Sequence, residues 1–264
     1  MRIVVILGRV LDPAGIVVNR RRGRIFVNRE EYVMQPADGC ALEAALQIKD
    51  GSEADVIVIP RDLSSGDDIL RQALSVGADR AIHFVGQVAN LTYDDAAMTP
   101  ALAAAVERLG EVDLILTGAT TLDTGQSQLG PRLAEALGWP QVVTSLQVCK
   151  SATGKVQAVI RQGSEYVTVE ADLPTLVTVH PGALKLRYPD GVRLINVYRD
   201  EGAVEQWDVA ELVDTGDLAP LLEKRGQDFP PERERGVRLE GAPQEMAQAL
   251  ADVLKARTLR QRVG

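Results

Sequence analysis

The stretch from Asp113 to Gln141 constrains the fold of this chain more than any other. The apolar residues from Leu114 to Thr117 predict a buried strand, and a loop rich in Gly, Thr, Asp and Gln follows it. A helix comes next, with its apolar residues on one face. These residues are Leu129, Leu133, Ala136 and Leu137. In an open α/β sheet, ligands lie beyond the carboxyl ends of the strands, where loop amides and the positive end of the following helix attract anions. The loop is therefore interpreted as a phosphate-binding loop.

This loop lacks the motifs of two common nucleotide sites. Gly118 and Gly125 are not followed by the Gly-Lys-Ser/Thr of a Walker loop, and the spacing of a dinucleotide fingerprint is also missing. Asp123, Ser127 and Gln128 are placed to bond a ribose or a base edge rather than a metal ion. The loop therefore predicts an anion site of neither common type.

Strand and helix signals alternate in the part of the chain before Gln141. Ile3 to Leu7 is a continuous apolar run, as expected of a parallel strand that is buried on both faces. Asp38 is placed as the N-cap of the first helix. The other predicted elements are the strands Val56 to Ile59 and Ala81 to Phe84 and the helices Asp67 to Val76 and Thr99 to Leu109, the last with Pro100 in its first turn. Right-handed crossovers wind such a series into a mostly parallel, doubly wound α/β sheet.

Beyond Trp139 and Pro140 the pattern changes to alternating strands. The segments Val156 to Arg161 and Tyr166 to Glu170 alternate apolar and polar residues, which is typical of antiparallel strands with one wet face. The sequence therefore predicts an antiparallel meander that extends the sheet. A chain of 264 residues suits one large domain with an appendage better than two equal domains.

Composition excludes several classes of protein. The net charge of −8 argues against a nucleic-acid binder, whose affinity depends on Lys and Arg. No apolar stretch is long enough to span a membrane and no signal sequence is visible, so a cytoplasmic location without membrane insertion is expected. Cys40 and Cys149 are far apart, which argues against a zinc site, and Cys40 is expected to be a buried free thiol. Without a nucleophile motif or a Walker lysine, the chain is not expected to be an enzyme.

Two basic segments allow contrasting interpretations. The turn from Asn19 to Gly23 joins the short β-like runs Ile16 to Val18 and Arg24 to Val27, and its arginines either contact a partner or form a solvated hairpin tip, which is the favoured interpretation. The loop at about 180–198 is predicted to be open and positive, with Asp190 as its one acidic residue. It is a candidate docking surface, or else an ordinary linker.

The last sixty residues or so are amphiphilic and interrupted. A short helix is predicted near Val209 to Val213 and a longer one from Pro243 to Ala256. Since this segment has too few large apolar residues for a core of its own, it is expected to lie on a partner chain.

Several motifs together resemble one known family. Asp123, Gln128, Gly130 and the run Gly138 to Gln141 occupy a loop-helix pattern that ends in Gly-Trp-Pro-Gln. Similar matches follow in order along almost the whole chain. They are Pro36 and Asp38 before the first helix, Ala73 to Arg80, Leu173 with Pro174, Arg187 with Tyr188, and the segment from Pro230 to Val237. In these motifs the chain resembles the β (small) subunit of the electron-transfer flavoproteins.

The resemblance implies a fold like that of the adenine nucleotide α-hydrolases and a heterodimer with a larger α subunit that carries FAD. The β subunit would hold AMP or a second FAD and would pass electrons between dehydrogenases and an acceptor protein. Residues 1–200 would form the nucleotide-binding domain, and residues 201–264 would form a C-terminal arm on the α subunit. The alternative from the residues alone is a stand-alone adenine-nucleotide-binding regulator of the universal-stress-protein type.

The resemblance also implies which residues carry the two sites. The cofactor-binding residues would be Ile6, Gln35, Pro36, Ala37, Asp38, Arg61, Asp123, Thr124, Gly125, Gln126, Ser127, Gln128, Leu129, Gly130, Pro131, Arg132, Leu133 and Ala134. The partner-docking residues would be Lys185, Arg187, Tyr188, Gly191 and Arg193. The chain departs from the family pattern at Gln35, Ala37, Gly125 and Gly191, where the family has Asn, an aromatic residue, Asp and Leu.

Overall fold

A computed structural model describes residues 1–63, 66–86, 94–218, 220–223, 225, 236 and 238–261. The chain divides into two compact units, Met1–Lys224 and Arg225–Gly264. The first unit is an α/β domain and the second contains a single long helix in its described part. Among the described residues, no helix is both long enough and apolar enough to cross a membrane.

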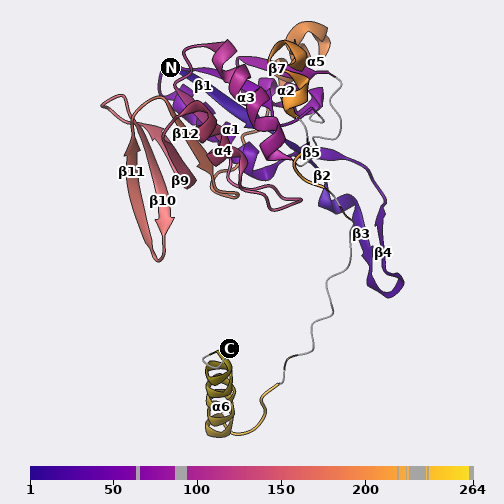
Figure 1. Ribbon diagram of the computed structural model, residues 1–264, viewed down its shortest axis with the longest axis vertical. Coiled ribbons are helices and arrows are strands. Elements are labelled where there is room, and N and C mark those ends of the chain that lie inside the picture. Colours follow the sequence, from indigo (N-terminus) through magenta and orange to yellow (C-terminus); the bar gives the residue numbers. More distant parts are fainter. Residues whose placement is uncertain are drawn as a thin grey trace. The chain divides into compact units, whose positions relative to one another are not determined.

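The α/β domain is built on a sheet of nine strands (Figure 1). In spatial order these are β11 (Glu165–Ala171), β10 (Val156–Gln162), β9 (Gln141–Lys150), β12 (Thr175–Val179), β8 (Leu114–Gly118), β1 (Arg2–Leu7), β6 (Asp55–Pro60), β7 (Arg80–Val85) and β13 (Glu205–Asp208). All neighbours from β9 to β13 pair in parallel, whereas β9, β10 and β11 pair antiparallel. The predicted mostly parallel sheet with an added meander is confirmed.

Helices cover both faces of the parallel part of this sheet. On one face, α1 (Pro36–Asp50) and α2 (Asp67–Val76) pack over Ile3, Val5 and Leu7 of β1. On the other face, α3 (Asp95–Leu109) and α4 (Leu129–Leu137) share a core with Val4 and Ile6. The alternate residues of one strand thus enter two different cores, which is why β1 is apolar without interruption.

The start of α3 differs from the prediction, which placed it at Thr99. The helix begins at Asp95, because the side chain of Asp94 accepts a hydrogen bond of 3.1 Å from the backbone N–H of Ala97. Pro100 therefore lies inside the helix rather than in its first turn.

The predicted open loop at 180–198 is wrong in its second half. A helix, α5 (Gly191–Arg199), forms there, with the side chain of Asp190 accepting a hydrogen bond of 2.9 Å from the backbone N–H of Arg193. Val197 of this helix packs against the core that contains α2. The acidic residue before Gly191 thus acts as an N-cap, which turns part of the loop into a helix.

Both runs of the predicted hairpin are confirmed. The strands β3 (Ile16–Asn19) and β4 (Arg24–Val27) pair antiparallel around the short 3-10 helix η2 (Arg20–Arg22). A second small sheet, β2 (Arg9–Leu11) with β5 (Tyr32–Met34), connects this hairpin to β1 and α1, with the 3-10 helix η1 (Pro13–Gly15) between β2 and β3. Figure 1 shows the hairpin as a projection from the domain.

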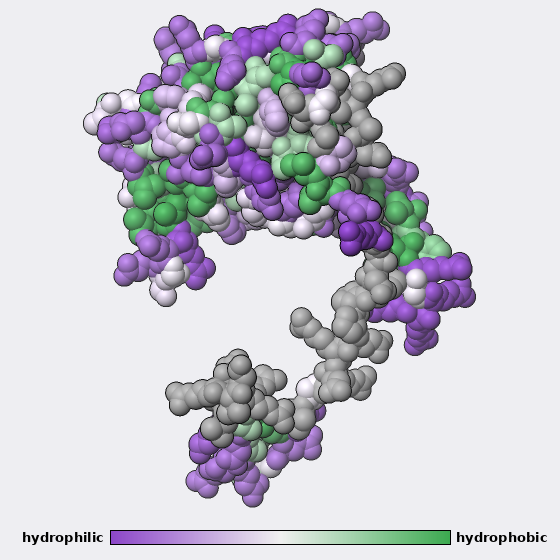
Figure 2. Space-filling view, viewed as in Figure 1, coloured by the Kyte–Doolittle hydropathy of each residue, from purple (hydrophilic) through white to green (hydrophobic). Residues whose placement is uncertain are grey.

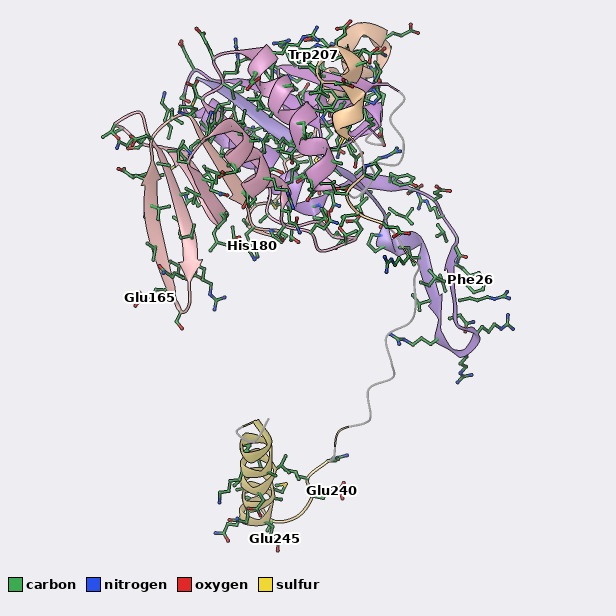
Figure 3. The ribbon with its side chains drawn as sticks, in the orientation of Figure 1. Phe26, Glu165, His180, Trp207, Glu240 and Glu245 are labelled. Carbon is green, nitrogen blue, oxygen red and sulfur yellow. The ribbon has the colours of Figure 1, made fainter. Side chains whose placement is uncertain are left out.

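The α/β domain extends further along the chain than residue 200, where the sequence suggested a boundary. Beyond that residue β13 pairs with β7 at the edge of the sheet, and the residues Val204, Val209 and Leu218 are buried. Trp207 of β13, labelled in Figure 3, lies 4.5 Å from the guanidinium of Arg108. This part also contains the 3-10 helices η3 (Glu201–Ala203), η4 (Val209–Glu211) and η5 (Thr215–Leu218). In the second unit, α6 (Pro243–Gln261) is longer than the predicted helix.

Candidate functional site

The centre of the candidate site is the point where the chain leaves β1 and β8 in opposite directions. These strands are neighbours, yet α1 follows β1 onto one face and α4 follows β8 onto the other. Such a switch point opens a crevice at the carboxyl ends of the two strands, and this is the usual ligand site of doubly wound sheets. Gly118 is the last residue of β8, and Gly8 directly follows the last residue of β1.

The carboxylate of Asp38 bridges the ends of these two strands. Its Oδ2 accepts a hydrogen bond of 2.7 Å from the backbone N–H of Gly8, and its Oδ1 accepts one of 2.9 Å from that of Gly118. Burial raises the pKa of Asp38 to about 6, although Arg61 and the two backbone N–H groups oppose this shift. Asp38 is therefore not the N-cap that the sequence suggested. It lies in the first turn of α1, whose N-cap is Gln35.

Gly118 is required by the same contact. A Cβ atom at this position would lie 2.4 Å from Oδ1 of Asp38 and 2.7 Å from the Cβ of Ala37. The absence of a side chain lets the start of α1 approach the end of β8 closely. The close contact between the backbone of Gly118 and the carboxylate of Asp38 thus fixes this wall of the crevice.

A cavity of about 240 Å³ lies beside this bridge. Five of its lining residues were predicted, namely Gln35, Arg61, Asp123, Thr124 and Gln126. Six were not predicted, namely Arg9, Val10, Leu11, Tyr32, Asp62 and Thr121. Arg9 and Tyr32 belong to β2 and β5, and the guanidinium of Arg9 lies 4.5 Å from the centre of the Tyr32 ring. The one sequence signal that could have predicted Arg9 as a cavity residue is its position directly after Gly8, beyond the end of the first predicted strand.

Gln35 ties the predicted phosphate loop to the start of α1. Its Oε1 accepts a hydrogen bond of 2.9 Å from the backbone N–H of Leu122, and its Nε2 donates one of 3.3 Å to Oδ1 of Asp123. The same carboxylate oxygen accepts a bond of 2.8 Å from the N–H of Thr124. The structure thus brings these two predicted segments, 88 residues apart, to one wall of the cavity.

Arg61 supplies a buried positive charge at the cavity. Its Nη2 and Nε lie 2.6 Å and 3.1 Å from Oδ1 of Asp95, in the first turn of α3. Both side chains are largely buried. Oδ2 of Asp95 accepts no hydrogen bond from the described residues. Because the ion pair anchors one edge of the guanidinium, Arg61 is held in place where it faces the cavity.

The remaining predicted cofactor residues do not line this cavity. Pro36 lines a separate apolar pocket, while Ile6, Ala37, Leu129, Leu133 and Ala134 are buried core residues. Gly130 lets α4 pack on β12, because a Cβ there would lie 2.3 Å from Cγ2 of Thr178. The residues Gly125, Ser127, Gln128, Pro131 and Arg132 lie in the loop or in the first turns of α4. Gln128 is the N-cap of α4 but makes no side-chain capping hydrogen bond, because its Oε1 accepts one of 3.0 Å from Nε of Arg132 instead. The backbone N–H groups of Leu129 and Gly130 therefore receive no side-chain cap from Gln128.

The predicted docking residues are divided between two environments. Arg187 was expected to have no acidic neighbour except Asp190, but its Nη2 lies 3.0 Å from Oε1 of Glu43 and 2.8 Å from Oδ2 of Asp50. Burial raises the pKa of Glu43, but the hydrogen bonds of Arg187 outweigh burial and leave the pKa below its usual value. Arg187 therefore fixes its segment to α1. The sequence could not show this, because the partners lie 144 and 137 residues away.

The exposed part of the predicted docking segment carries four large apolar side chains. Tyr188, Val192, Ile195 and Tyr198 are exposed on or just before α5. Lys185 lies over the ring of Tyr188, with Nζ 5.5 Å from the ring centre. Cys40 is a buried free thiol, as predicted, and its Sγ donates to the carbonyl of Leu184 at 3.0 Å.

Comparisons with known proteins agree with this architecture. The electron transfer flavoprotein domain matches residues 24–212. The electron transfer flavoprotein subunit beta of Bacillus subtilis is 27% identical over 257 residues, which cover 97% of this chain and 98% of that protein. Protein FixA of Azorhizobium caulinodans is 33% identical over 71% of this chain and 68% of its own length. The caffeyl-CoA reductase-Etf complex subunit CarD of Acetobacterium woodii is 31% identical over 67% of this chain and 68% of its own length.

These matches cover both the sheet and the loops that form the cavity, and they confirm the resemblance seen in the sequence motifs. The chain therefore belongs to the electron transfer flavoprotein family and is homologous to its β subunits and to FixA over most of its length.

Proposed function

We propose that this chain is the small subunit of a heterodimeric electron transfer flavoprotein. In this role it binds an adenine nucleotide, pairs with a larger flavin-carrying subunit, and passes electrons between dehydrogenases and an acceptor protein. The observation that carries the proposal is the arginine-lined cavity at the β1/β8 switch point, in a chain with the family's domain. A bound flavin supplies the electron chemistry, and the protein binds and orients it.

The groups around the cavity suit a phosphorylated ribose. Arg9 and Arg61 place two positive charges in the lining of a protein whose net charge is −8. Gln35, Asp123 and Thr124 offer amide, carboxylate and hydroxyl groups of the kind that bond ribose hydroxyls. Outside the cavity lining, the backbone N–H groups of Leu129 and Gly130 at the start of α4 would supply a further anion contact, in the loop-helix segment that the sequence motifs assigned to the phosphate.

The cavity is small, which suits the AMP portion of a nucleotide better than a whole dinucleotide. Its volume of about 240 Å³ lies below the range of roughly 300–1,000 Å³ that is usual for ligand sites. We propose that it holds the AMP unit, either as free AMP or as the adenylate half of a second FAD. In the second case the flavin half would extend out of the cavity.

Purification of the co-expressed αβ pair tests the function. Heat release of the bound nucleotide, followed by chromatography and a visible spectrum, identifies what the pair carries. One flavin and one AMP per pair would support the AMP version, and two flavins would support a second FAD. A chain that forms no complex with the large subunit, or a pair without adenine nucleotide, would overturn the proposal.

The docking surface of this function would be centred on α5. Val192, Ile195 and Tyr198 recur at helical spacing on its exposed side, and Arg193 and Arg199 lie between and after them. Exposed apolar residues with basic neighbours suit a partner protein whose surface is apolar and acidic. We assign the dehydrogenase to this surface.

A further inference from the structure

The β3/β4 hairpin exposes apolar side chains on both of its faces. In its register Val17 pairs with Phe26, whereas Val18 pairs with Ile25 on the opposite face. The exposed fractions are 45% for Val17, 39% for Phe26, 50% for Val18 and 53% for Ile25. None of the eight strand residues is buried. Figure 2 shows hydrophobic residues along this hairpin and hydrophilic ones at its end, and Figure 3 labels Phe26 on it.

Exposed apolar pairs on both faces indicate that a binding partner covers each face of the hairpin. An isolated two-stranded hairpin is marginally stable in water, and an antiparallel pair that lies on a flat surface has one apolar and one polar face. Here both faces carry large apolar pairs, so a flat surface such as a membrane or a single sheet would cover half of them. A cleft with two apolar walls would cover both.

The tip of the hairpin carries a concentrated positive charge. Arg20, Arg21 and Arg22 form η2, Arg24 follows, and the segment from residue 16 to 27 contains no Asp or Glu. None of these four arginines forms an ion pair with another residue that the structure describes. Since the chain as a whole has a net charge of −8, this charge is a local feature. A carboxylate-rich end of the cleft would complement it.

The hairpin also has a defined relation to the nucleotide cavity. It continues from β2 and β5, whose residues Arg9, Val10, Leu11 and Tyr32 line that cavity. A protein that holds the hairpin therefore lies next to the nucleotide. The proposed function gives this chain one permanent partner, the flavin-carrying large subunit, and we therefore take that subunit as the protein that holds the hairpin.

We propose that the hairpin from Ile16 to Val27 inserts into an apolar cleft of the large subunit, with acidic residues at the end of the cleft that receives the arginines. This inference rests on the proposed function only in naming the partner. It assigns to the hairpin a share of the binding energy of the heterodimer. It also replaces the solvated hairpin tip that was the favoured interpretation of the sequence.

Dissociation of the purified αβ pair on dilution, measured by mass photometry, tests the proposal. The variant Val17→Thr/Phe26→Thr removes one apolar face and Val18→Thr/Ile25→Thr removes the other, while Thr keeps the β-propensity of the strands. Each variant should raise the Kd of the pair by at least about tenfold, as expected for interface anchors. Arg20→Gln/Arg21→Gln/Arg22→Gln should weaken the dependence of Kd on KCl concentration.

Matched controls separate this interface from general damage. Val192→Thr/Ile195→Thr removes comparable exposed apolar groups from α5 and should leave the Kd of the pair unchanged. The hairpin variants should keep the circular dichroism spectrum and melting temperature of the wild-type chain, since none of the changed side chains is buried.

Three outcomes would contradict the proposal in different ways. If the wild-type chain pairs with the large subunit and both hairpin variants pair equally well, the hairpin inference is wrong and the proposed function stands. If the wild-type chain forms no pair at all, the proposed function fails, and the inference fails with it. If the chain alone binds vesicles of phosphatidylserine and the hairpin variants do not, the hairpin serves a membrane surface rather than a protein cleft.

Discussion

Asp38 and Gly118 hold together two segments that lie 80 residues apart in the chain. The backbone N–H of Gly118 donates a hydrogen bond of 2.9 Å to the buried carboxylate of Asp38, at the point where β8 ends and the predicted phosphate loop begins. The second oxygen of the carboxylate accepts from Gly8 at the end of β1. One side chain of α1 thus sets the spacing of the two strands from which the cavity opens.

Gly118→Ala tests how tightly this junction is packed. The new Cβ would lie 2.4 Å from Oδ1 of Asp38 and 2.8 Å from the backbone carbon of Ala37, so the start of α1 must move. We expect the free energy of unfolding to fall by at least about 3 kcal/mol, measured by urea denaturation. Gly191→Ala is the control, because its added Cβ would meet no atom within 4 Å among the described residues, apart from its chain neighbours and its own helix backbone. It should change stability by less than about 1 kcal/mol.

Asp38→Asn tests the charge of the carboxyl. Burial raises the pKa of Asp38 from 3.8 to about 6, so between these pH values the folded chain binds more protons than the unfolded chain. The stability that this group contributes is present below about pH 4 and is lost as the pH rises through about 6, by about 3 kcal/mol in total. As the pH rises from below about 4 to above about 6, the unfolding free energy of the wild type should therefore fall by that amount relative to the variant. A difference that stays constant with pH would contradict the assignment.

Arg187→Met tests the anchoring of the docking segment. The change leaves the largely buried carboxylate of Glu43 without its ion-pair partner, so we expect a loss of about 2 kcal/mol at neutral pH. Because Arg187 lowers the pKa of Glu43, the stability that the pair contributes is present above about pH 4.5 and declines as the pH falls through the folded pKa. The loss should therefore shrink in acid. Arg193→Met, in the exposed first turn of α5, should cost less than about 0.5 kcal/mol in the same unfolding assay.

Arg9→Gln tests the proposed nucleotide binding in the cavity without breaking a buried ion pair. The change removes one of the two cationic side chains from the lining, and we expect AMP affinity to fall by at least about tenfold, measured by calorimetry on chain freed of nucleotide. Arg199→Gln removes the same charge at the end of α5, away from the cavity lining, and should bind AMP as the wild type does. Equal affinities for all three proteins would rule out Arg9 as a phosphate ligand.

Val192→Thr/Ile195→Thr tests the docking surface in electron transfer. We expect kcat/KM for reduction of the αβ pair by its dehydrogenase to fall by at least about tenfold, because two exposed apolar anchors are lost. The hairpin variant Val17→Thr/Phe26→Thr serves as the reciprocal control at protein concentrations that keep the pair assembled. A normal kcat/KM for the α5 variant would place dehydrogenase docking elsewhere.

The sequence by itself determined the alternation of strands and helices that builds the parallel sheet, and it indicated a crevice at the carboxyl ends of the strands. Apolar runs such as Ile3 to Leu7 fix parallel strands, because a strand buried on both faces has no polar positions. The alternation after Val156 fixed the antiparallel meander in the same way. Such signals are local, since periodicity and caps act within a few residues, and the same holds for the polar loop before α4.

Only the tertiary structure decided which polar groups meet. The carboxylate of Asp38 was assigned a local capping role, whereas its partners are the ends of two strands far away in the chain. Arg187 was assigned to an open loop, whereas Glu43 and Asp50 hold it on α1. Arg9 and Tyr32 line the cavity because β2 pairs with β5, and the sequence did not predict this pairing. Hydrogen bonds and ion pairs between distant segments leave no periodic trace in a sequence, because their geometry exists only after the sheet and its helices have packed.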